Sequence, residues 1–132
     1  MTAGRHRVPG PGGASYSDAV IVDAGELRWV YVAGQTPRAT GPHGDVPHDL
    51  KGQTELCFAQ IAAILESLDA GLGDVVQITA YLTSLDNYSE FAAVRAAFFG
   101  DEPPSSAVVG VASLLDAALV EIAAVAVTST AA

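Results

Sequence analysis

The last predicted strand, Leu119-Val120-Glu121-Ile122-Ala123-Ala124-Val125-Ala126-Val127, decides the fold because it is apolar almost throughout. Such a run is typical of a strand with both faces covered. Its one charged residue, Glu121, stands between Val120 and Ile122. A carboxylate at this position has to be paired, protonated or used in chemistry, because burial of an unpaired charge is costly. Glu121 is therefore the first candidate for a functional residue.

Working outward, residues 19–22 and 27–33 read as two strands joined by a hairpin turn at residues 23–26. Residues 34–47 show no periodicity and are expected to form a loop. A helix is predicted from the N-cap Asp49 to about residue 70, with Gly71 as the residue that ends it. Its buried face is expected at helical spacing, from Cys57, Ile61, Ile64, Leu65 and Leu68.

The second half of the chain repeats the alternation of strand and helix. Residues 75–83 are predicted to form a strand, followed by a helix that begins at Asp86 or Asn87 and ends at Gly100. Asn87 and Glu90 have capping-box spacing. A strand over residues 107–112 precedes the last one. The order β-β-α-β-α-β-β predicts an α+β domain, with two helices packed on one face of a mixed sheet.

Two helices can cover only one face of this sheet, although several strands are apolar on both faces. The other face needs a partner, so a homo-oligomer is expected. The alternative is an ordinary two-sided core in a monomer, which is disfavoured because no third helix is predicted.

Composition limits the function classes. The 132 residues carry a formal net charge of −9, which disfavours nucleic acid as a partner. No apolar run is long enough to span a membrane, and no secretory signal is predicted. The single cysteine, Cys57, is expected to be a buried thiol of a cytoplasmic protein. Residues 1–15 are expected to form a flexible N-terminal arm, and residues 16–132 the domain.

Taken in order, several short motifs resemble the reactive-intermediate deaminase (Rid, or YjgF) family over residues 16–127. The motifs are Tyr16-Ser17-Asp18-Ala19-Val20, Ala33-Gly34-Gln35, Asp74-Val75-Val76, Tyr81-Leu82-Thr83, Phe98-Phe99-Gly100, Pro103-Pro104, Val109-Gly110-Val111-Ala112 and Val120-Glu121-Ile122. The resemblance implies a chorismate-mutase-like fold and a homotrimer with three clefts between subunits, where small molecules bind.

The resemblance also implies a reaction: archetypal members hydrolyse enamines and imines derived from amino acids to ammonia and a 2-keto acid. In them an arginine clamps the substrate carboxylate, a glutamate positions water, a tyrosine lines the cleft and an asparagine assists. Tyr16 and Glu121 match this pattern. Ser106 occupies the arginine's position and Ala92 the asparagine's.

The change to serine matters because a guanidinium binds a carboxylate through two charge-assisted hydrogen bonds, whereas a hydroxyl offers one neutral contact. Losing the clamp should cost roughly 2–5 kcal/mol in binding a carboxylate. The sequence therefore indicates a divergent member with a less acidic or neutral ligand. Arg38, in the loop after Gln35, is an alternative source of positive charge; a solvated loop arginine is the other interpretation.

The remaining candidates have two interpretations each. Glu121 is a candidate general acid/base, because a carboxyl group can both take and give a proton; alternatively it stabilises the fold through hydrogen bonds. Tyr16 either donates a hydrogen bond to a ligand from the wall of a cleft, or is an aromatic residue of a subunit interface. Gly34 either offers its backbone N–H to a ligand oxygen, or is a glycine that the turn requires. The candidate ligand-binding positions are Ser106, Gly34, Gln35, Arg38 and Ala92.

Three functions follow as hypotheses. The first is an enzyme that acts on an imine, enamine or related carbonyl compound by general acid/base chemistry. The second is a non-catalytic binding or interaction protein of the same fold. The third, a ribonuclease, is disfavoured by the charge. No cofactor is expected, and His43 and His48 are expected to lie in a solvated loop because their spacing fits no standard metal site.

Overall fold

The computed structural model describes residues 4–39 and 45–130. Its two helices are α1 (Leu50–Glu66) and α2 (Tyr88–Phe99). Its strands are β1 (Gly4–Pro9), β2 (Ser17–Ala24), β3 (Leu27–Gln35), β4 (Val75–Leu82), β5 (Ser105–Gly110) and β6 (Val120–Ser129).

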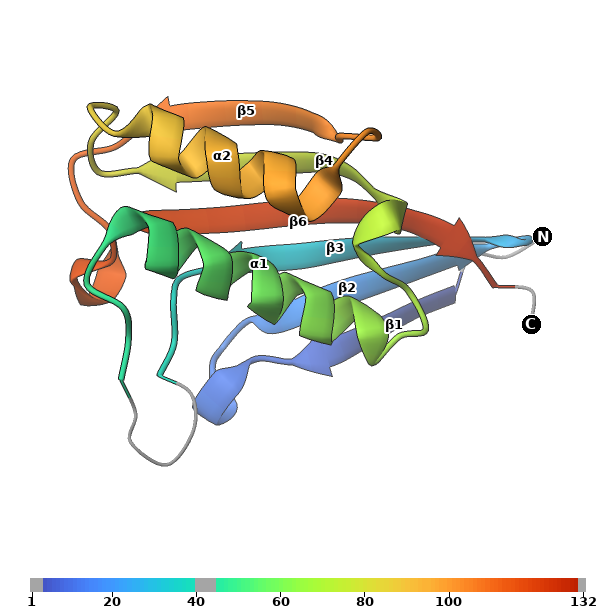
Figure 1. Cartoon of the computed structure of the whole chain (residues 1–132). Coiled ribbons are helices and arrows are strands. Elements are labelled where there is room, and N and C mark those ends of the chain that lie inside the picture. The colour runs from blue at the N-terminus through green and yellow to red at the C-terminus, as the bar shows by residue number, and fades with distance from the viewer. Residues whose placement is uncertain (1–3, 40–44, 131–132) are drawn as a thin grey trace.

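All of these strands belong to one sheet, in the order β1-β2-β3-β6-β4-β5. Neighbouring strands are antiparallel except β4 and β5, which are parallel and are connected through α2. Both helices lie on the same face of the sheet (Figure 1). The predicted α+β class, with two helices on one face of a mixed sheet, is confirmed.

The N-terminal residues differ from the prediction. Residues 4–15 were expected to belong to a flexible arm, but Gly4–Pro9 forms strand β1, which pairs with β2 from Gly4 opposite Asp23 to Pro9 opposite Ser17. The observed order therefore has one strand more at its start than β-β-α-β-α-β-β. The strand is at the edge of the sheet and exposes Arg5, His6 and Arg7. Charged residues are common on edge strands. They also interrupt the alternation of apolar residues from which a strand is predicted, so the sequence did not indicate this one.

Helix α1 begins as predicted and ends earlier. The Asp49 side chain accepts a hydrogen bond from the Gly52 N–H (3.2 Å), which is the expected N-cap contact. The helix ends at Glu66, because the chain turns through Asp69, which has a φ of 57°. Gly71 is extended and is not the C′ residue that was predicted.

Helix α2 begins after Asn87, but the Asn87 side chain makes no capping hydrogen bond, so the predicted capping box does not form. Gly100 ends the helix with a φ of 60°, as expected for a glycine at this position. Strand β5 begins at Ser105, two residues before the predicted start, and ends at Gly110. The start of β5 was predicted too late because Ser105 and Ser106 are polar and do not belong to the apolar run that follows them.

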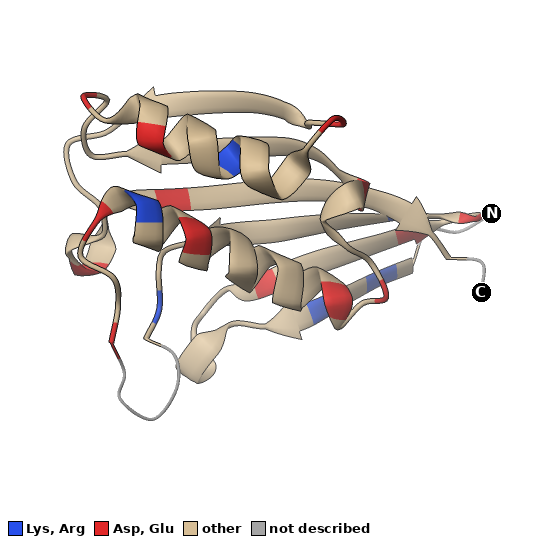
Figure 2. Cartoon of the chain, in the orientation of Figure 1, with Lys and Arg blue, Asp and Glu red and all other residues tan. Residues whose placement is uncertain are grey.

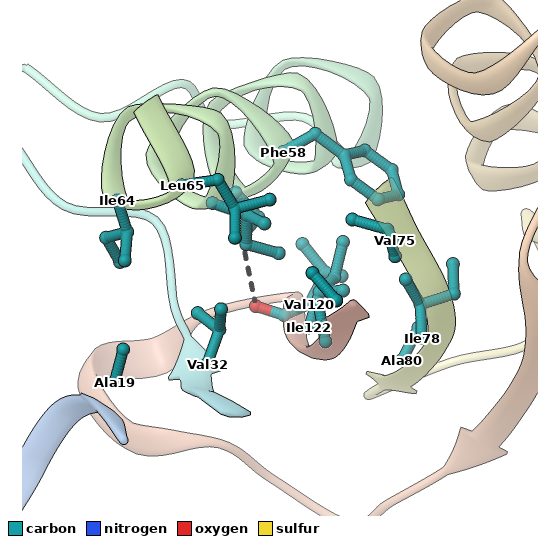
Figure 3. Close-up of a cluster of buried hydrophobic side chains, with 14 of the residues drawn as sticks. Ala19, Val32, Phe58, Ile64, Leu65, Val75, Ile78, Ala80, Val120 and Ile122 are labelled. Atoms are coloured by element: carbon teal, nitrogen blue, oxygen red, sulfur yellow. Dashed lines mark hydrogen bonds between the residues drawn. The ribbon is translucent and has the colours of Figure 1, made fainter. Parts of the chain in front are cut away.

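The core lies between the helices and the sheet (Figure 3). Phe58 of α1 is its centre. The Phe58 ring is fully buried, and its centroid lies 5.2 Å from that of Phe98, 5.4 Å from that of Phe99 and 6.3 Å from that of Phe91. These contacts join α1 to α2 and hold both on the same face of the sheet.

We predict that Phe58→Ala lowers the free energy of unfolding by about 3–5 kcal/mol, since it leaves a cavity at the contact between the two helices. Leu115→Ala is the control, because Leu115 is 77% exposed. Its effect should stay below about 0.5 kcal/mol. Both are measured by chemical denaturation at one protein concentration. Equal effects for the two variants would contradict this description of the core.

Candidate functional site

Glu121 lies on the sheet face that the helices leave uncovered. Its neighbours Val120 and Ile122 are completely buried on the helix side, so the alternation of β6 directs Glu121 to the opposite face. The side chain is half-buried in a single chain. Among the described residues, its carboxylate makes no hydrogen bond and no ion pair. Glu121 therefore does not serve as an internal hydrogen-bonding or ion-pairing group within that part of the chain.

Gly34 makes room for the Glu121 carboxylate. The pairing of β3 with β6 is irregular between Val32 and Gln35, and Gly34 lies in this irregularity. A Cβ atom at residue 34 would lie 2.9 Å from the Glu121 Cδ and 3.2 Å from its Cγ. A contact of 2.9 Å is essentially never made by a real Cβ atom, so a larger residue at position 34 would displace the Glu121 carboxylate from its present position. Glycine therefore leaves the space that the carboxylate occupies.

Tyr16 directly precedes β2 and is 52% exposed. Because Ala19 of β2 pairs with Val32 of β3, the start of β2 lies beside the end of β3, where Gly34 is located. Tyr16, Gly34 and Glu121 thus belong to the same end of the sheet.

Gln35 and Arg38 form a separate polar cluster on the helix side. The Gln35 Nε2 donates to the Asp18 Oδ1 (2.9 Å), and the Arg38 Nη2 donates to the Gln35 Oε1 (3.0 Å). The same Arg38 nitrogen lies 3.8 Å from the Asp18 Oδ2. Gln60 of α1 donates to both the Gln35 Oε1 and the Thr36 carbonyl. These hydrogen bonds hold the segment after β3 against α1. The positive charge of Arg38 is paired within the chain.

Ser106 lies on the helix side of edge strand β5, opposite the buried Ile78 of β4. Its hydroxyl oxygen accepts a hydrogen bond from the Arg95 Nη1 of α2 (2.9 Å), and the Arg95 Nη2 donates to the Tyr88 hydroxyl (2.8 Å). Ala92 lies between Tyr88 and Arg95 on the same stripe of the helix, at spacings of four and three residues.

Arg95 was missed from the sequence. One signal was available: residues 88, 92 and 95 have the spacing of a single helix face, which aligns Arg95 with the candidate Ala92. What the sequence does not show is that α2 passes over β5 closely enough for Arg95 to reach Ser106.

The candidate residues therefore form two groups on opposite faces of the sheet. Glu121, Gly34 and Tyr16 belong to the open face or its end, whereas Ser106, Ala92 and Arg95 lie on the helix side of an edge strand. A ligand that touches both Glu121 and Ser106 cannot do so within one chain. An apolar groove of about 250 Å³ between α1 and α2, lined by residues that include Ala93, Ala97 and Phe98, contains none of the predicted site residues.

Cys57 is fully buried, as expected, and its Sγ lies 4.0 Å from the Val120 carbonyl oxygen. Burial, together with the negative charge of Glu121, raises the pKa of the Cys57 thiol to about 12, so it stays protonated at neutral pH. His43 lies outside the described residues. Within residues 4–39 and 45–130, no three metal-ligating side chains gather, and no helix is long and apolar enough to cross a membrane.

Known proteins are similar to this chain in sequence and in fold. A family model described as Endoribonuclease L-PSP matches residues 10–128. A RutC family protein of Pyrococcus abyssi is 35% identical over 111 residues, which cover 84% of this chain and 84% of that protein. TdcF of Escherichia coli strain K12, whose name describes it as a candidate reactive intermediate deaminase, is 30% identical over 111 residues, covering 82% of this chain and 84% of TdcF.

Solved structures of three proteins are similar to this chain in fold. Yeast Mmf1 superposes with a TM-score of 0.79 at 30% identity, covering 94% of this chain and 98% of Mmf1. A YjgF/YER057c/UK114 family member of Mycobacterium tuberculosis gives 0.76 at 32% identity, covering 95% of this chain and 100% of that one. E. coli TdcF with bound serine gives 0.77 at 30% identity, covering 93% and 94%.

Fold and site together define a small α+β protein with a carboxylate on the open face of its sheet. The chain belongs to the reactive-intermediate deaminase family, also called the Rid or YjgF family.

We predict that Gly34→Ala destabilises the wild-type chain by about 1 kcal/mol, because the new methyl group meets the Glu121 carboxylate. In a Glu121→Ala background the same change should cost less, since the obstructing side chain is gone. The double-mutant cycle should give a coupling of about 0.5–3 kcal/mol in unfolding free energy. Identical costs in the two backgrounds would show that Gly34 and Glu121 are not in contact.

Proposed function

We propose that this protein is an enzyme that hydrolyses a small imine, an enamine or a related carbonyl compound, with Glu121 as the general acid/base. We further propose that the reaction takes place in clefts between the subunits of a cytoplasmic homotrimer. The observation that carries the proposal is Glu121, a half-buried residue whose carboxylate has no internal partner among the described residues and occupies space left free by Gly34.

A carboxylate kept for stability would be expected to accept hydrogen bonds or pair with a cation, because burial without such contacts is costly. Asp18 shows the difference: it is buried and accepts a hydrogen bond from Gln35. Glu121 has no comparable contact among the described residues. Its position is better explained by a ligand or water that approaches from the open face.

The chemistry requires proton transfers in both directions. The reacting species is the iminium, the imine protonated on nitrogen. Glu121 accepts a proton from water as the water oxygen forms a bond to the iminium carbon, which gives a neutral carbinolamine. Glu121 then returns this proton to nitrogen, and it takes up the hydroxyl proton of the carbinolamine as the C–N bond breaks, which releases ammonia and leaves a carbonyl product. An enamine enters the same route because its protonation at carbon by a solvent proton gives the iminium. The Tyr16 hydroxyl and the Gly34 N–H are proposed to orient the substrate.

The open face of the sheet supports an oligomer. It is uncovered in the single chain and includes exposed apolar side chains such as Tyr31, Val76 and Val109, which are 47%, 48% and 42% exposed. Exposed apolar surface next to a candidate site favours an interface. A site shared by two copies would also bring Glu121 of one chain near Ser106 of another. The bound serine in TdcF supports a small molecule as the ligand.

The proposed reaction departs from the archetypal 2-imino acid deamination in how the substrate is held. Ser106 and Ala92 stand where the resemblance places an arginine and an asparagine. The same two replacements favour the alternative, a non-catalytic protein that kept the cleft for small-molecule binding or interaction. Turnover separates these functions.

We expect Glu121→Gln to reduce ammonia release by about 10²–10⁴-fold, because the amide keeps the shape but cannot transfer the proton. The substrates are enzymatically generated 2-aminoacrylate and a panel of uncharged imines. Glu66→Gln is the control, since Glu66 is exposed at the end of α1. Both variants should keep the oligomeric state of the wild type in sedimentation experiments.

Undiminished activity in Glu121→Gln would exclude Glu121 as the acid/base. Absence of turnover by the wild type across the panel, with retained binding of a substrate analogue, would favour the non-catalytic alternative.

A further inference from the structure

Arg95 is a positive charge that is held in place without a negative partner. Its guanidinium donates to two neutral hydroxyl groups, Ser106 Oγ at 2.9 Å and Tyr88 OH at 2.8 Å. Its central carbon also lies 5.2 Å from the centroid of the Phe91 ring and 5.7 Å from that of Tyr88. Among the described residues, no carboxylate lies within ion-pair distance of it.

This arrangement is unusual in so acidic a protein. The chain has 15 acidic residues and 6 basic ones, so carboxylates are abundant. Arg28 pairs with Asp23 at 2.7 Å and Arg38 lies 3.8 Å from Asp18. Figure 2 shows acidic positions on both helices. Arg95 is the one basic residue of α2. Arg95 has fixed contacts like the two paired arginines, yet all of these contacts are uncharged.

These contacts hold the Arg95 guanidinium in a fixed orientation, in which it can bind a planar anion. Two hydrogen bonds and two rings restrain a side chain that would otherwise lose much conformational entropy on binding. The group has more N–H donors than these two hydrogen bonds use. Arg95 is only half-buried, so solvent and ligands reach it. A fixed guanidinium with free donors matches the geometry of a carboxylate.

We infer that Arg95 binds a carboxylate group of the ligand, with Ser106 and Tyr88 as positioning residues that hold its guanidinium. The inference deepens the proposed function and rests on it, because it assigns a substrate class to that intersubunit site: an acid, not the neutral compound that Ser106 alone suggests. The positive charge comes from helix α2 and not from the strand position of Ser106.

A carboxylate fits better than a phosphate. A single guanidinium balances one negative charge, and no second basic residue contacts Arg95, Ser106 or Tyr88 among the described residues. A doubly charged phosphate would meet the repulsion of a chain with a formal net charge of −9. Ala92, one turn from Tyr88 on the same stripe, adds no bulk beside the guanidinium.

The test compares pyruvate with its uncharged amide, pyruvamide, in calorimetric or NMR titrations of the intact oligomer. Arg95→Gln should weaken pyruvate binding by about 10–100-fold and leave pyruvamide binding unchanged. Tyr88→Phe should weaken pyruvate binding less, because it removes one support of the guanidinium. Arg7→Gln is the charge-matched control, since Arg7 is exposed on β1, at the opposite edge of the sheet from β5, and should change neither affinity.

Equal pyruvate affinity in wild type and Arg95→Gln would overturn the inference, as would failure of the wild type to prefer pyruvate over pyruvamide. Tighter binding of inorganic phosphate than of pyruvate would overturn the choice of carboxylate. Glu121→Gln separates this inference from the proposed function, because it should retain the Arg95-dependent binding of pyruvate. If the wild type shows that binding but no turnover, the proposed reaction fails and the Arg95 subsite stands.

Discussion

Helices α1 and α2 cover one face of a six-stranded sheet, and the residues that alternate towards the other face are left uncovered in a single chain. This coverage of one face determines which residues of each strand enter the core and which remain exposed in the single chain. The buried side of β6 supplies Val120, Ile122, Ala124 and Ala126 to the core. The strand's period of two then sends Glu121 and its alternate neighbours to the open face. A carboxylate there stays near water in the isolated chain and becomes enclosed when another surface covers the sheet.

The division between the two faces explains why the candidate residues do not form one site within the chain. Glu121 with Gly34 lies on the open face, while Ser106 with Arg95 lies behind an edge strand, on the helix side. In the proposed assembly, a second copy brings the two groups together. In that arrangement a base from one chain and a guanidinium from another would hold the reacting part and the acidic part of one small molecule. Assembly would then be a condition for catalysis as well as for stability.

Much of the fold follows from the sequence, because apolar periodicity and caps report directly on buried strands and helices. The run around Glu121, the N-cap Asp49 and the terminating Gly100 were all interpreted correctly. Strand β1 was missed because an edge strand needs only backbone pairing, and Arg5, His6 and Arg7 conceal it. The end of α1 was placed too late because the turn at Asp69, with a positive φ at a non-glycine residue, has no clear sequence signal.

The site was less accessible to sequence reasoning. Glu121 and Gly34 could be selected from the strand and the turn, but their contact depends on an irregularity in the pairing of β3 with β6. Arg38 was the predicted substitute for a missing arginine, and its guanidinium is engaged by Gln35 and Asp18. The guanidinium at Ser106 belongs to Arg95, which lies 11 residues earlier in the chain, on a helix whose path over β5 only the tertiary structure shows.

The central claim is that one site takes Glu121 and Arg95 from different chains. Co-expression of Glu121→Gln and Arg95→Gln chains with different tags, followed by purification of the mixed oligomer, tests it through ammonia release from 2-aminoacrylate. Each homo-oligomer should be impaired at every site, whereas a purified mixed trimer should restore both residues at about a third of its sites, since one of its interfaces joins a chain with Glu121 to a chain with Arg95. Recovery of activity in the mixed oligomer is the predicted result. Activity no higher than that of the two parent variants would contradict the account.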